Sequence, residues 1–269
     1  MSGPAVVTVV HQRREHLSRQ RASLARSSTS GVDHVVVAMD DPDLAGADWC
    51  SAALPRAALG LPLAAARNRG AEVALARGAD TLIFLDVDCL ADEHLVEAYA
   101  DVVRDAPDTV WSGPVTYLDP PPAGGYDLAA LAELDAPHAA RPAPAVGERL
   151  PGADPDLFWS LSFACSAGAW RRAGGFCEDY VGYGGEDTDF ARVVLAAGLD
   201  LGWVGAARAY HQWHPVSRPP VEHVDDIVRN AEVFRSRWGT SPMTGWLEAF
   251  EERGLVRRDA DGRWQVVGG

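Results

Sequence analysis

Two patterns of hydrophobic and polar positions alternate along residues 1–118. Runs in which nearly every position is apolar, rich in valine and other β-branched residues, predict buried strands at residues 5–10, 34–39 and 81–85. Alanine-rich stretches with apolar residues at helical spacing predict helices at residues 13–26, 62–76 and 93–105. This alternation is typical of βαβ units, so we predict an α/β fold whose mainly parallel central sheet is flanked by helices.

The pattern is interrupted after a further predicted strand at residues 110–115. Residues 119–157 are dense in proline, alanine and glycine, which predicts a flexible loop of the kind that forms a lid over a site. Regular patterns then predict strands at 158–163 and 201–204, helices at 167–173, 187–197, 221–238 and 243–253, and a terminal strand at 263–267. We expect these elements to form one structural domain.

Charge and composition exclude several classes of function. The formal net charge of −14 disfavours a nucleic acid or an anionic membrane as the main partner, because both need a basic surface. All 24 residues counted as lysine or arginine are arginine, which excludes a Walker A phosphate loop and a lysine Schiff base. A phosphate ligand would therefore need a metal cation or a few local arginines.

Compartment and redox state are predicted from what the sequence lacks. It has no run of the roughly 20 apolar residues that a transmembrane helix needs, and its N-terminus lacks the sections of a signal peptide, so we expect a cytoplasmic protein. The four cysteines form no CxxC pair, which argues against a zinc knuckle or a disulfide scaffold.

Two aspartates follow the predicted strand 81–85. Asp86 and Asp88 are spaced i and i+2, so both lie on one face of an extended chain at the carboxyl end of the sheet, where ligands bind in open α/β folds. Their hard oxygens suit Mg²⁺ or Mn²⁺ bridging to substrate phosphates. Two solvated loop carboxylates, or the nucleophile of an aspartyl phosphatase, are the alternatives. The phosphatases normally place their motif after the first strand and use a lysine.

The segment GGFCEDYVGYGGEDTDF is the second candidate for chemistry. Its glycines at 182, 184 and 185 allow positive φ or a close approach of a ligand, and Glu186 and Asp187 open a predicted helix. Acids at a helix start also interact favourably with the helix dipole, so a purely structural role is the alternative interpretation.

Together, LDVDC and GYGGEDTDF resemble the GT-A glycosyltransferases. The family 2 enzymes, the β-1,4-galactosyltransferases and the polypeptide N-acetylgalactosaminyltransferases share a segment close to Gly-Trp-Gly-Gly-Glu-Asp, and LPLAAARNRGAEVALARGAD is similar to a helix of family 2. This chain has Tyr183 where those families usually have tryptophan. In the galactosyltransferases that residue lies against the acceptor sugar, so the substitution leaves the identity of the acceptor in question.

The resemblance implies a nucleotide-diphospho-sugar transferase with a bound cation. Asp88 would bind the metal directly, and Asp86 would contact the metal or the ribose. His211, or alternatively His214, would be the third metal ligand, and an imidazole ligand favours Mn²⁺ over Mg²⁺. The donor would be a UDP- or GDP-sugar and the acceptor a sugar or another small molecule.

The resemblance also implies roles for residues on the donor and acceptor sides. The residues implied to line the donor pocket are Thr8, His11, Arg13, Asp40, Arg67, Asn68 and Asp86, with Asp40 a partner for the imide of a uracil. Tyr183, Gly184, Gly185 and Glu186 would bind the acceptor. Asp187 would be the general base and Glu186 would orient the acceptor hydroxyl, which implies inversion at the anomeric carbon as in family 2. The polypeptide N-acetylgalactosaminyltransferases retain configuration with similar motifs, so retention is the alternative.

The chain is thereby divided into four segments within one domain. Residues 1–118 form the nucleotide-sugar-binding half, 119–157 the flexible loop, 158–218 the acceptor and catalytic half, and 219–269 a helical appendage. Two alternatives stay open, namely a sugar nucleotidyltransferase and a non-catalytic nucleotide-sugar or carbohydrate-binding module. The first usually has a glycine-rich N-terminal loop, which VVTVVHQRREHL lacks, and the second would be expected to lose one acidic motif.

Overall fold

An eight-stranded mixed sheet forms the centre of the computed structural model, which describes residues 3–267. Its strands, in spatial order, are β3 (Cys50–Leu54), β2 (Asp33–Met39), β1 (Pro4–Val10), β4 (Thr81–Leu85), β9 (Ser162–Ser166), β6 (Thr109–Ser112), β10 (Asp200–Val204) and β8 (Arg149–Pro151). Strands β9 and β8 run antiparallel to their neighbours, and the other pairs are parallel. The predicted α/β class with a mainly parallel sheet is confirmed.

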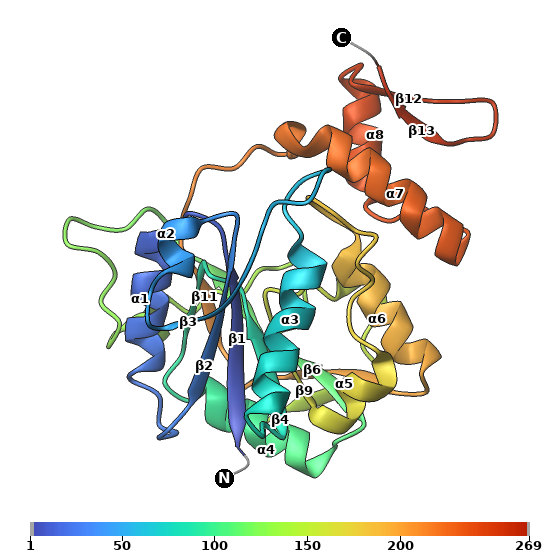
Figure 1. The fold of residues 1–269 in the computed structure, drawn as a ribbon. Helices are drawn as coiled ribbons and strands as arrows, with labels where there is room; N and C mark the ends of the chain where they lie inside the picture. The colour runs from blue at the N-terminus through green and yellow to red at the C-terminus, as the bar shows by residue number, and fades with distance from the viewer. Residues whose placement is uncertain (1–2, 268–269) are drawn as a thin grey trace.

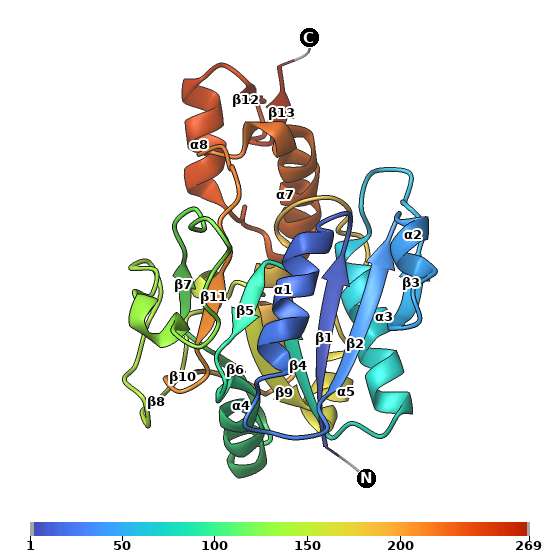
Figure 2. The ribbon, with the colours of Figure 1, turned by 90° about the vertical axis from the view of Figure 1, so that its left-hand side faces the viewer.

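Helices cover both faces of this sheet (Figures 1 and 2). One face packs against α3 (Leu63–Ala76), α5 (Ala167–Ala173) and α6 (Glu186–Ala196), and the other against α1 (Arg14–Leu24), α2 (Pro42–Ala45) and α4 (Leu95–Asp105). Within β1, Val7 packs on the α3 face while Val6 packs on the opposite face. Because both faces are buried, the central strands are apolar at nearly every position instead of alternating.

A small second sheet places a histidine beside the aspartate motif. It consists of β5 (Cys89–Ala91), β11 (Ala209–His211) and β7 (Val115–Tyr117), in that order. The antiparallel register pairs His211 with Cys89, which directly follows Asp88. Backbone pairing therefore brings together two segments that are far apart in the sequence.

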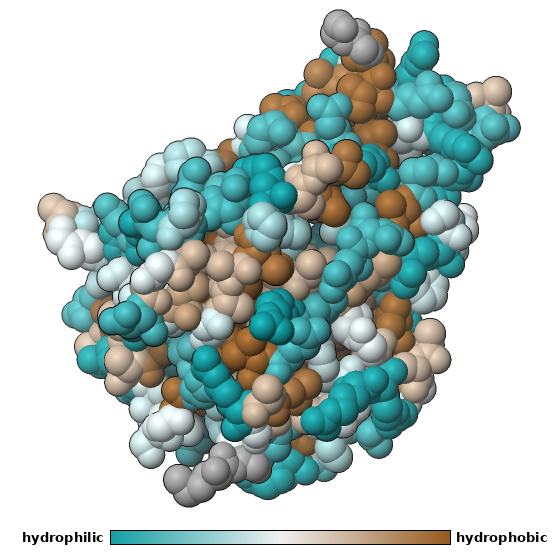
Figure 3. Space-filling model, in the orientation of Figure 1, coloured by the Kyte–Doolittle hydropathy of each residue, from teal (hydrophilic) through white to brown (hydrophobic). Residues whose placement is uncertain are grey.

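The C-terminal appendage, residues 219–267, projects beyond the carboxyl ends of β1 and β2 (Figures 1 and 2). It contains η3 (Val221–His223), α7 (Val224–Trp238), α8 (Thr244–Glu252) and a hairpin of β12 (Val256–Arg258) and β13 (Trp264–Val266). Its helices and hairpin enclose a small apolar cluster of their own, and Figure 3 shows hydrophobic surface on this unit at the top of the view. No helix among residues 3–267 is long and apolar enough to cross a membrane.

Several predicted elements differ from the structure for identifiable reasons. The half-exposed edge strand β3 was not predicted, so the strand before the aspartates is the fourth of the chain and not the third. The predicted strand 110–115 is split between β6 and β7 at Gly113 and Pro114, and Pro114 has no N–H to donate to a strand partner. The chain at Gly113 lies so close to Ala207 that a Cβ atom would be 1.9 Å from its carbonyl oxygen, so only glycine fits there. The predicted strand 158–163 is shifted to β9.

The proline-rich segment contains more structure than the sequence indicates. Residues 119–157 include η1 (Leu131–Leu134), strand β8 and η2 (Pro155–Leu157). Pairing of β8 with β10 fixes one end of the segment on the central sheet. Its opening and closing over a site remain a prediction.

Packing of α3 on the sheet predicts a sharp steric effect at Gly70. A Cβ atom there would lie 2.3 Å from Cγ1 of Val7, so Gly70→Ala should lower the free energy of unfolding by about 1–3 kcal/mol through overpacking. Gly245→Ala is the matched control, because a Cβ in α8 meets nothing within 4 Å and alanine is the better helix former by about 1 kcal/mol. Urea unfolding of both variants checks this, and equal stability of the two would contradict the packing described.

Candidate active site

A buried arginine joins the two acidic motifs. Arg67, on α3, is 4% exposed and donates from one guanidinium nitrogen to Asp86 Oδ1 at 3.1 Å and from the other to Glu186 Oε1 at 3.0 Å. Burial alone would lower the pKa of Arg67, but the two carboxylates outweigh it and raise the pKa above its ordinary value. The end of β4 and the start of α6 are therefore held together by one charge that stays positive at any physiological pH.

Asp86 keeps a high proton affinity in spite of this ion pair. Burial raises its pKa to about 6, with a further contribution from the nearby Asp88 carboxylate, while Arg67 acts in the opposite direction. Its side chain is 25% exposed and thus faces the surface of the site on one side.

Asp88 lies at the centre of a cluster of potential metal ligands. Its Oδ2 is 3.5 Å from Nε2 of His211 and 3.4 Å from Nε2 of His214, and it accepts a hydrogen bond from Arg13 at 2.7 Å. The ligand atoms of the aspartate and both histidines lie within 4.8 Å of one another. The other oxygen, Oδ1, is buried and has no hydrogen-bond partner among the described residues.

The electrostatics of this cluster favour an ionised carboxylate and neutral imidazole. Burial would raise the pKa of Asp88, but His211, His214 and Arg13 outweigh it and hold the pKa well below its usual range. Burial lowers the pKa of His211, although Asp88 opposes that shift. A carboxylate and unprotonated ring nitrogens are the forms that coordinate a divalent cation.

Asp187 is a partly exposed carboxyl group in the first turn of α6. Its Oδ1 accepts a hydrogen bond from the backbone N–H of Thr188 at 2.7 Å. Burial, followed by the adjacent Glu186 charge, raises the pKa of Asp187 to about 7. Asp189, two residues on, is fully buried and accepts hydrogen bonds from Tyr180, Arg237 and Trp238, which assigns it a structural role.

The glycines before α6 have backbone conformations that other residues rarely adopt. Gly182, Gly184 and Gly185 have φ of 77°, 92° and 92°, and a Cβ on Gly184 would lie 2.8 Å from the sulfur of Met243. The positive φ that the sequence suggested is therefore present, and the glycines also pack closely on neighbouring side chains. Tyr183 is 38% exposed next to them.

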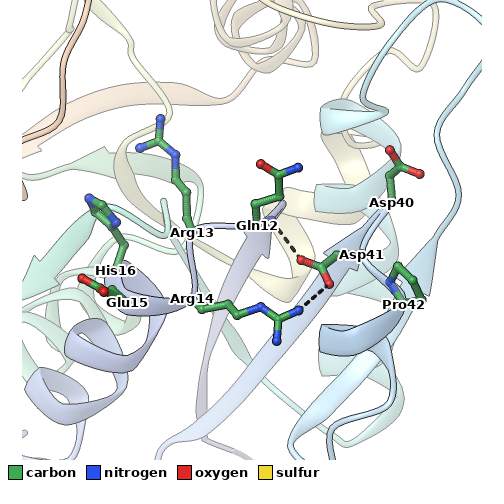
Figure 4. Close-up of a pocket in the computed structure, with 8 residues that line it drawn as sticks. All are labelled: Gln12, Arg13, Arg14, Glu15, His16, Asp40, Asp41 and Pro42. Carbon is green, nitrogen blue, oxygen red and sulfur yellow. Dashed lines mark hydrogen bonds and ion pairs between the residues drawn. The ribbon is translucent and has the colours of Figure 1, made fainter.

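A cavity of about 720 Å³ opens at the ends of β1 and β2 (Figure 4), and one of its lining residues, Arg13, pairs with Asp88. The residues that line it are Gln12, Arg13, Arg14, Glu15, His16, Asp40, Asp41 and Pro42. Asp40 is exposed and pairs with Arg56 at 2.8 Å. Asp41, which the sequence analysis did not select, is buried, accepts hydrogen bonds from the N–H groups of Gln12 and Leu44, and thereby fixes the wall of the cavity.

Two residues predicted to line the donor pocket are engaged elsewhere. Thr8 is fully buried, and its hydroxyl contacts Gln20, the carbonyl of Leu85 and His34, so it faces α1 and the sheet interior. Asn68 uses its amide on the backbone of Phe176 and on Glu178. Neither side chain lines the cavity described above, and their assignment to a donor pocket stays a prediction.

Most of the remaining predicted residues are brought together. Ion pairs and close charges link eight of them in one cluster around the acidic centre. These are Arg13, Arg67, Asp86, Asp88, Glu186, Asp187, His211 and His214. His11 lies at the edge of this region, where its Nδ1–H donates to the carbonyl of Met39 at 2.8 Å.

Two further features were missed because they depend on tertiary contacts. Tyr117 stacks on His211 at 4.5 Å with an interplanar angle of 17°, and so supports the ring of a potential metal ligand. Arg141 is 7% exposed, and its guanidinium lies over the rings of Trp159 at 5.2 Å and Trp203 at 4.7 Å. Neither residue stands in a recognisable motif, and Arg141 lies in the proline-rich segment.

The Arg67 bridge predicts a large and specific loss of stability. Arg67→Met leaves the buried Glu186 and the partly buried Asp86 without this partner and should lower the free energy of unfolding by about 3–5 kcal/mol at pH 8. The loss should shrink as the pH falls, because protonation then removes the unpaired charges. Arg69→Met, on the same helix but exposed and paired only with Glu72, should change stability by about 0.5 kcal/mol or less. Urea unfolding of both variants at pH 8 and at a lower pH measures these losses, and equal losses for the two variants would contradict the role of Arg67 described here.

The raised pKa of Asp187 should lower the stability of the folded protein at higher pH, an effect that the variant Asp187→Asn should lack. Its pKa of about 7 exceeds the ordinary value of 3.8, so the folded protein binds this proton more tightly than the unfolded chain does. This contribution to stability is present at low pH and is lost as the pH rises to about 7. Asp187→Asn should therefore gain stability relative to the parent protein between pH 4 and pH 7 and keep that gain above it. A constant difference across a pH series of thermal unfolding curves would show that the carboxyl is not perturbed.

Comparisons with known proteins agree with this geometry. A family model described as the N-terminal domain of galactosyltransferase matches residues 154–223, which include the Gly-Gly-Glu-Asp segment and His211. Two curated relatives are the validoxylamine A glucosyltransferases of Streptomyces hygroscopicus subsp. limoneus and of subsp. jinggangensis (strain 5008). Each is 30% identical over 93% of this chain, which spans 60% and 64% of the length of those relatives.

Solved structures show the same fold at low sequence identity. The crystal structure of GalNAc-T7 with UDP, GalNAc and Mn²⁺ superposes with a TM-score of 0.57 at 14% identity, covering 100% of this chain and 66% of that one. The structure of Staphylococcus aureus TarS residues 1–349 gives a TM-score of 0.54 at 12% identity, covering 86% of this chain and 64% of that one. The chain therefore has the GT-A fold of glycosyltransferases, and the resemblance seen in LDVDC and GYGGEDTDF is confirmed.

Proposed function

We propose that this chain is a metal-dependent glycosyltransferase that moves a sugar from a nucleoside diphosphate to an acceptor hydroxyl, with inversion. The observation that carries the proposal is the Arg67 bridge, because it unites Asp86 and Glu186, one from each acidic motif, in a single site. A cation-binding carboxylate on one side and a proton-accepting carboxylate on the other are what this transfer requires.

The relatives suggest which substrates to test first. The two curated relatives are named as glucosyltransferases acting on validoxylamine A, and GalNAc-T7 was crystallised with UDP and Mn²⁺. We accordingly propose UDP-glucose as the first donor, ahead of a GDP-sugar, and validoxylamine A as the first acceptor.

Asp88, His211 and His214 fit a divalent cation. The orphaned Oδ1 of Asp88 is a buried acceptor that a cation would satisfy, and two imidazole ligands favour Mn²⁺ over Mg²⁺. When bound, such a cation stabilises the negative charge that develops on the leaving diphosphate by several kcal/mol. Arg13, at the mouth of the donor cavity, is positioned to add a second positive charge there.

The acidic residues of α6 supply the acceptor chemistry. Asp187, with a pKa of about 7, is ionised in half or more of the molecules at and above neutral pH and retains a strong affinity for a proton, so it suits a general base. It would take the proton of the acceptor hydroxyl as that oxygen forms its bond to the anomeric carbon and the bond to the diphosphate breaks. Glu186 is fixed by Arg67 and would orient the acceptor through its remaining oxygen. Direct attack of this kind inverts the anomeric centre.

Donor binding should depend on both the cation and Asp88. With Mn²⁺ present, a panel of UDP-, GDP-, dTDP- and CDP-sugars should raise the melting temperature for one nucleotide class, and EDTA should abolish the rise. Asp88→Ala should fold but give no donor shift, whereas Asp101→Ala, on the exposed face of α4, should behave as the parent protein does. No shift from any donor, or a normal shift in Asp88→Ala, would contradict the proposed site.

Binding and chemistry should separate at Asp187. Asp187→Asn preserves shape but cannot take a proton, so transfer from the donor should fall about 10²- to 10⁴-fold while donor and metal binding persist. Glu186→Gln should instead raise the KM for acceptor together with a loss of rate. Initial rates at saturating donor, beside separate nucleotide titrations, measure both effects. Transfer by Asp187→Asn within a few-fold of normal would move the base to another residue, Glu186 first.

A further inference from the structure

Three aromatic rings from distant parts of the sequence form one partly exposed surface, which we call the aromatic platform. Tyr183 lies before α6, His223 ends η3 and Trp246 is in α8. The Tyr183 ring stacks on His223 at 4.5 Å with an interplanar angle of 14°, and on Trp246 at 5.9 Å and 27°. Tyr183 is 38% exposed and Trp246 36%, so each leaves part of its aromatic surface open to solvent.

The appendage holds the segment that carries the platform. The fully buried Asn230 of α7 donates from Nδ2 toward the carbonyls of Val181, Tyr183 and Gly184, the last at 2.9 Å. Asp226 accepts from the N–H of Tyr183 at 3.2 Å. Because these bonds go to backbone groups, the position of the glycine-rich loop depends directly on α7.

The same unit also fixes the first turn of α6. Arg237 and Trp238, at the end of α7, donate to Asp189 at 2.6 Å and 2.7 Å. Asp189 is two residues from Asp187, the proposed base. The appendage is thus attached on both sides of the Glu186 and Asp187 pair.

The platform adjoins the acidic centre. Tyr183 is separated from Glu186 only by the two glycines with positive φ. Burial raises the pKa of Tyr183, and the carboxylates of Asp187, Glu186 and Asp86 add to the shift, which places its ring within their field. The platform therefore lies close to the acidic centre, and the surrounding negative charge disfavours an anionic ligand there.

We propose that the appendage completes the acceptor site and that the partly exposed indole of Trp246, which stacks on Tyr183, binds the apolar face of a neutral ring bearing several hydroxyl groups, a pyranose or a cyclitol. This inference rests on the proposed function and extends the acceptor surface beyond the segment around Tyr183 to the C-terminal unit. The exposed indole of Trp246 offers a flat aromatic surface that suits the C–H face of such a ring. An extended flexible polyol or a lipid tail would gain less from this flat, exposed surface.

The test compares ring and linear ligands on matched variants. Methyl β-D-glucoside, myo-inositol and validoxylamine A are titrated against the full chain with UDP and Mn²⁺ present, followed by saturation-transfer NMR, and sorbitol serves as the linear control. Trp246→Ala should weaken ring binding by about tenfold, and Trp246→Phe should retain most of it. Trp264→Ala removes an indole from the hairpin of the same appendage and should leave ring binding unchanged. Thermal unfolding verifies that each variant is folded.

The outcomes separate this inference from the proposed function. Binding of at least one ring ligand, its loss in Trp246→Ala and its retention in Trp246→Phe and Trp264→Ala would support the platform. If UDP binds but no ring ligand does, or if both tryptophan-to-alanine variants lose binding equally, the platform is not the acceptor site while the transferase proposal stands. If UDP itself fails to bind the parent protein, it is the proposed function that fails.

Discussion

The structure depends on one buried positive charge, that of Arg67, which pairs with two of the four carboxylates clustered in the site. Asp86, Asp88, Glu186 and Asp187 converge at the carboxyl end of the sheet, and their mutual repulsion would oppose folding if nothing compensated it. Arg67 is inserted between two of them from α3 and is almost completely buried. Since removing one partner of a buried ion pair leaves an uncompensated charge, Arg67 makes the packing of α3 against the end of β4 and the start of α6 mutually dependent.

This arrangement also gives neighbouring carboxylates different proton affinities. Asp88 is kept ionised by His211, His214 and Arg13, which suits it to hold a cation. The pKa of Asp187 is raised to about 7 by burial and by Glu186, which suits it to exchange a proton near neutral pH. Environment, and not residue type, thus separates a binding role from an acid–base role within one acidic site.

The sequence predicted the parts of the fold that local pattern determines. Strands β1, β2 and β4 and helix α5 were located closely, because buried parallel strands are continuously apolar and α5 has a clear serine cap and a terminal glycine. Edge strand β3 was missed because its side chains are half-exposed and small.

Within the site, the acidic motifs and His211 were identified because they stand in recognisable segments. The contacts of Thr8 and Asn68 with the protein interior and with the segment around Phe176 could not be predicted, because the sequence does not show which way a side chain at a strand end or on a helix points. Tyr117, Arg141 and Trp246 carry no local signal, since each is defined only by the rings that it meets.

The central claim is that the two acidic motifs form a single site for a cation and a nucleoside diphosphate. Electron paramagnetic resonance of Mn²⁺ titrated into the protein, with and without UDP, tests it most directly. We predict one bound ion per chain, an altered spectrum when UDP is added, and loss of the ion in Asp88→Ala but not in Asp101→Ala. No stoichiometric binding by the parent protein, or binding that Asp88→Ala leaves unchanged, would contradict it.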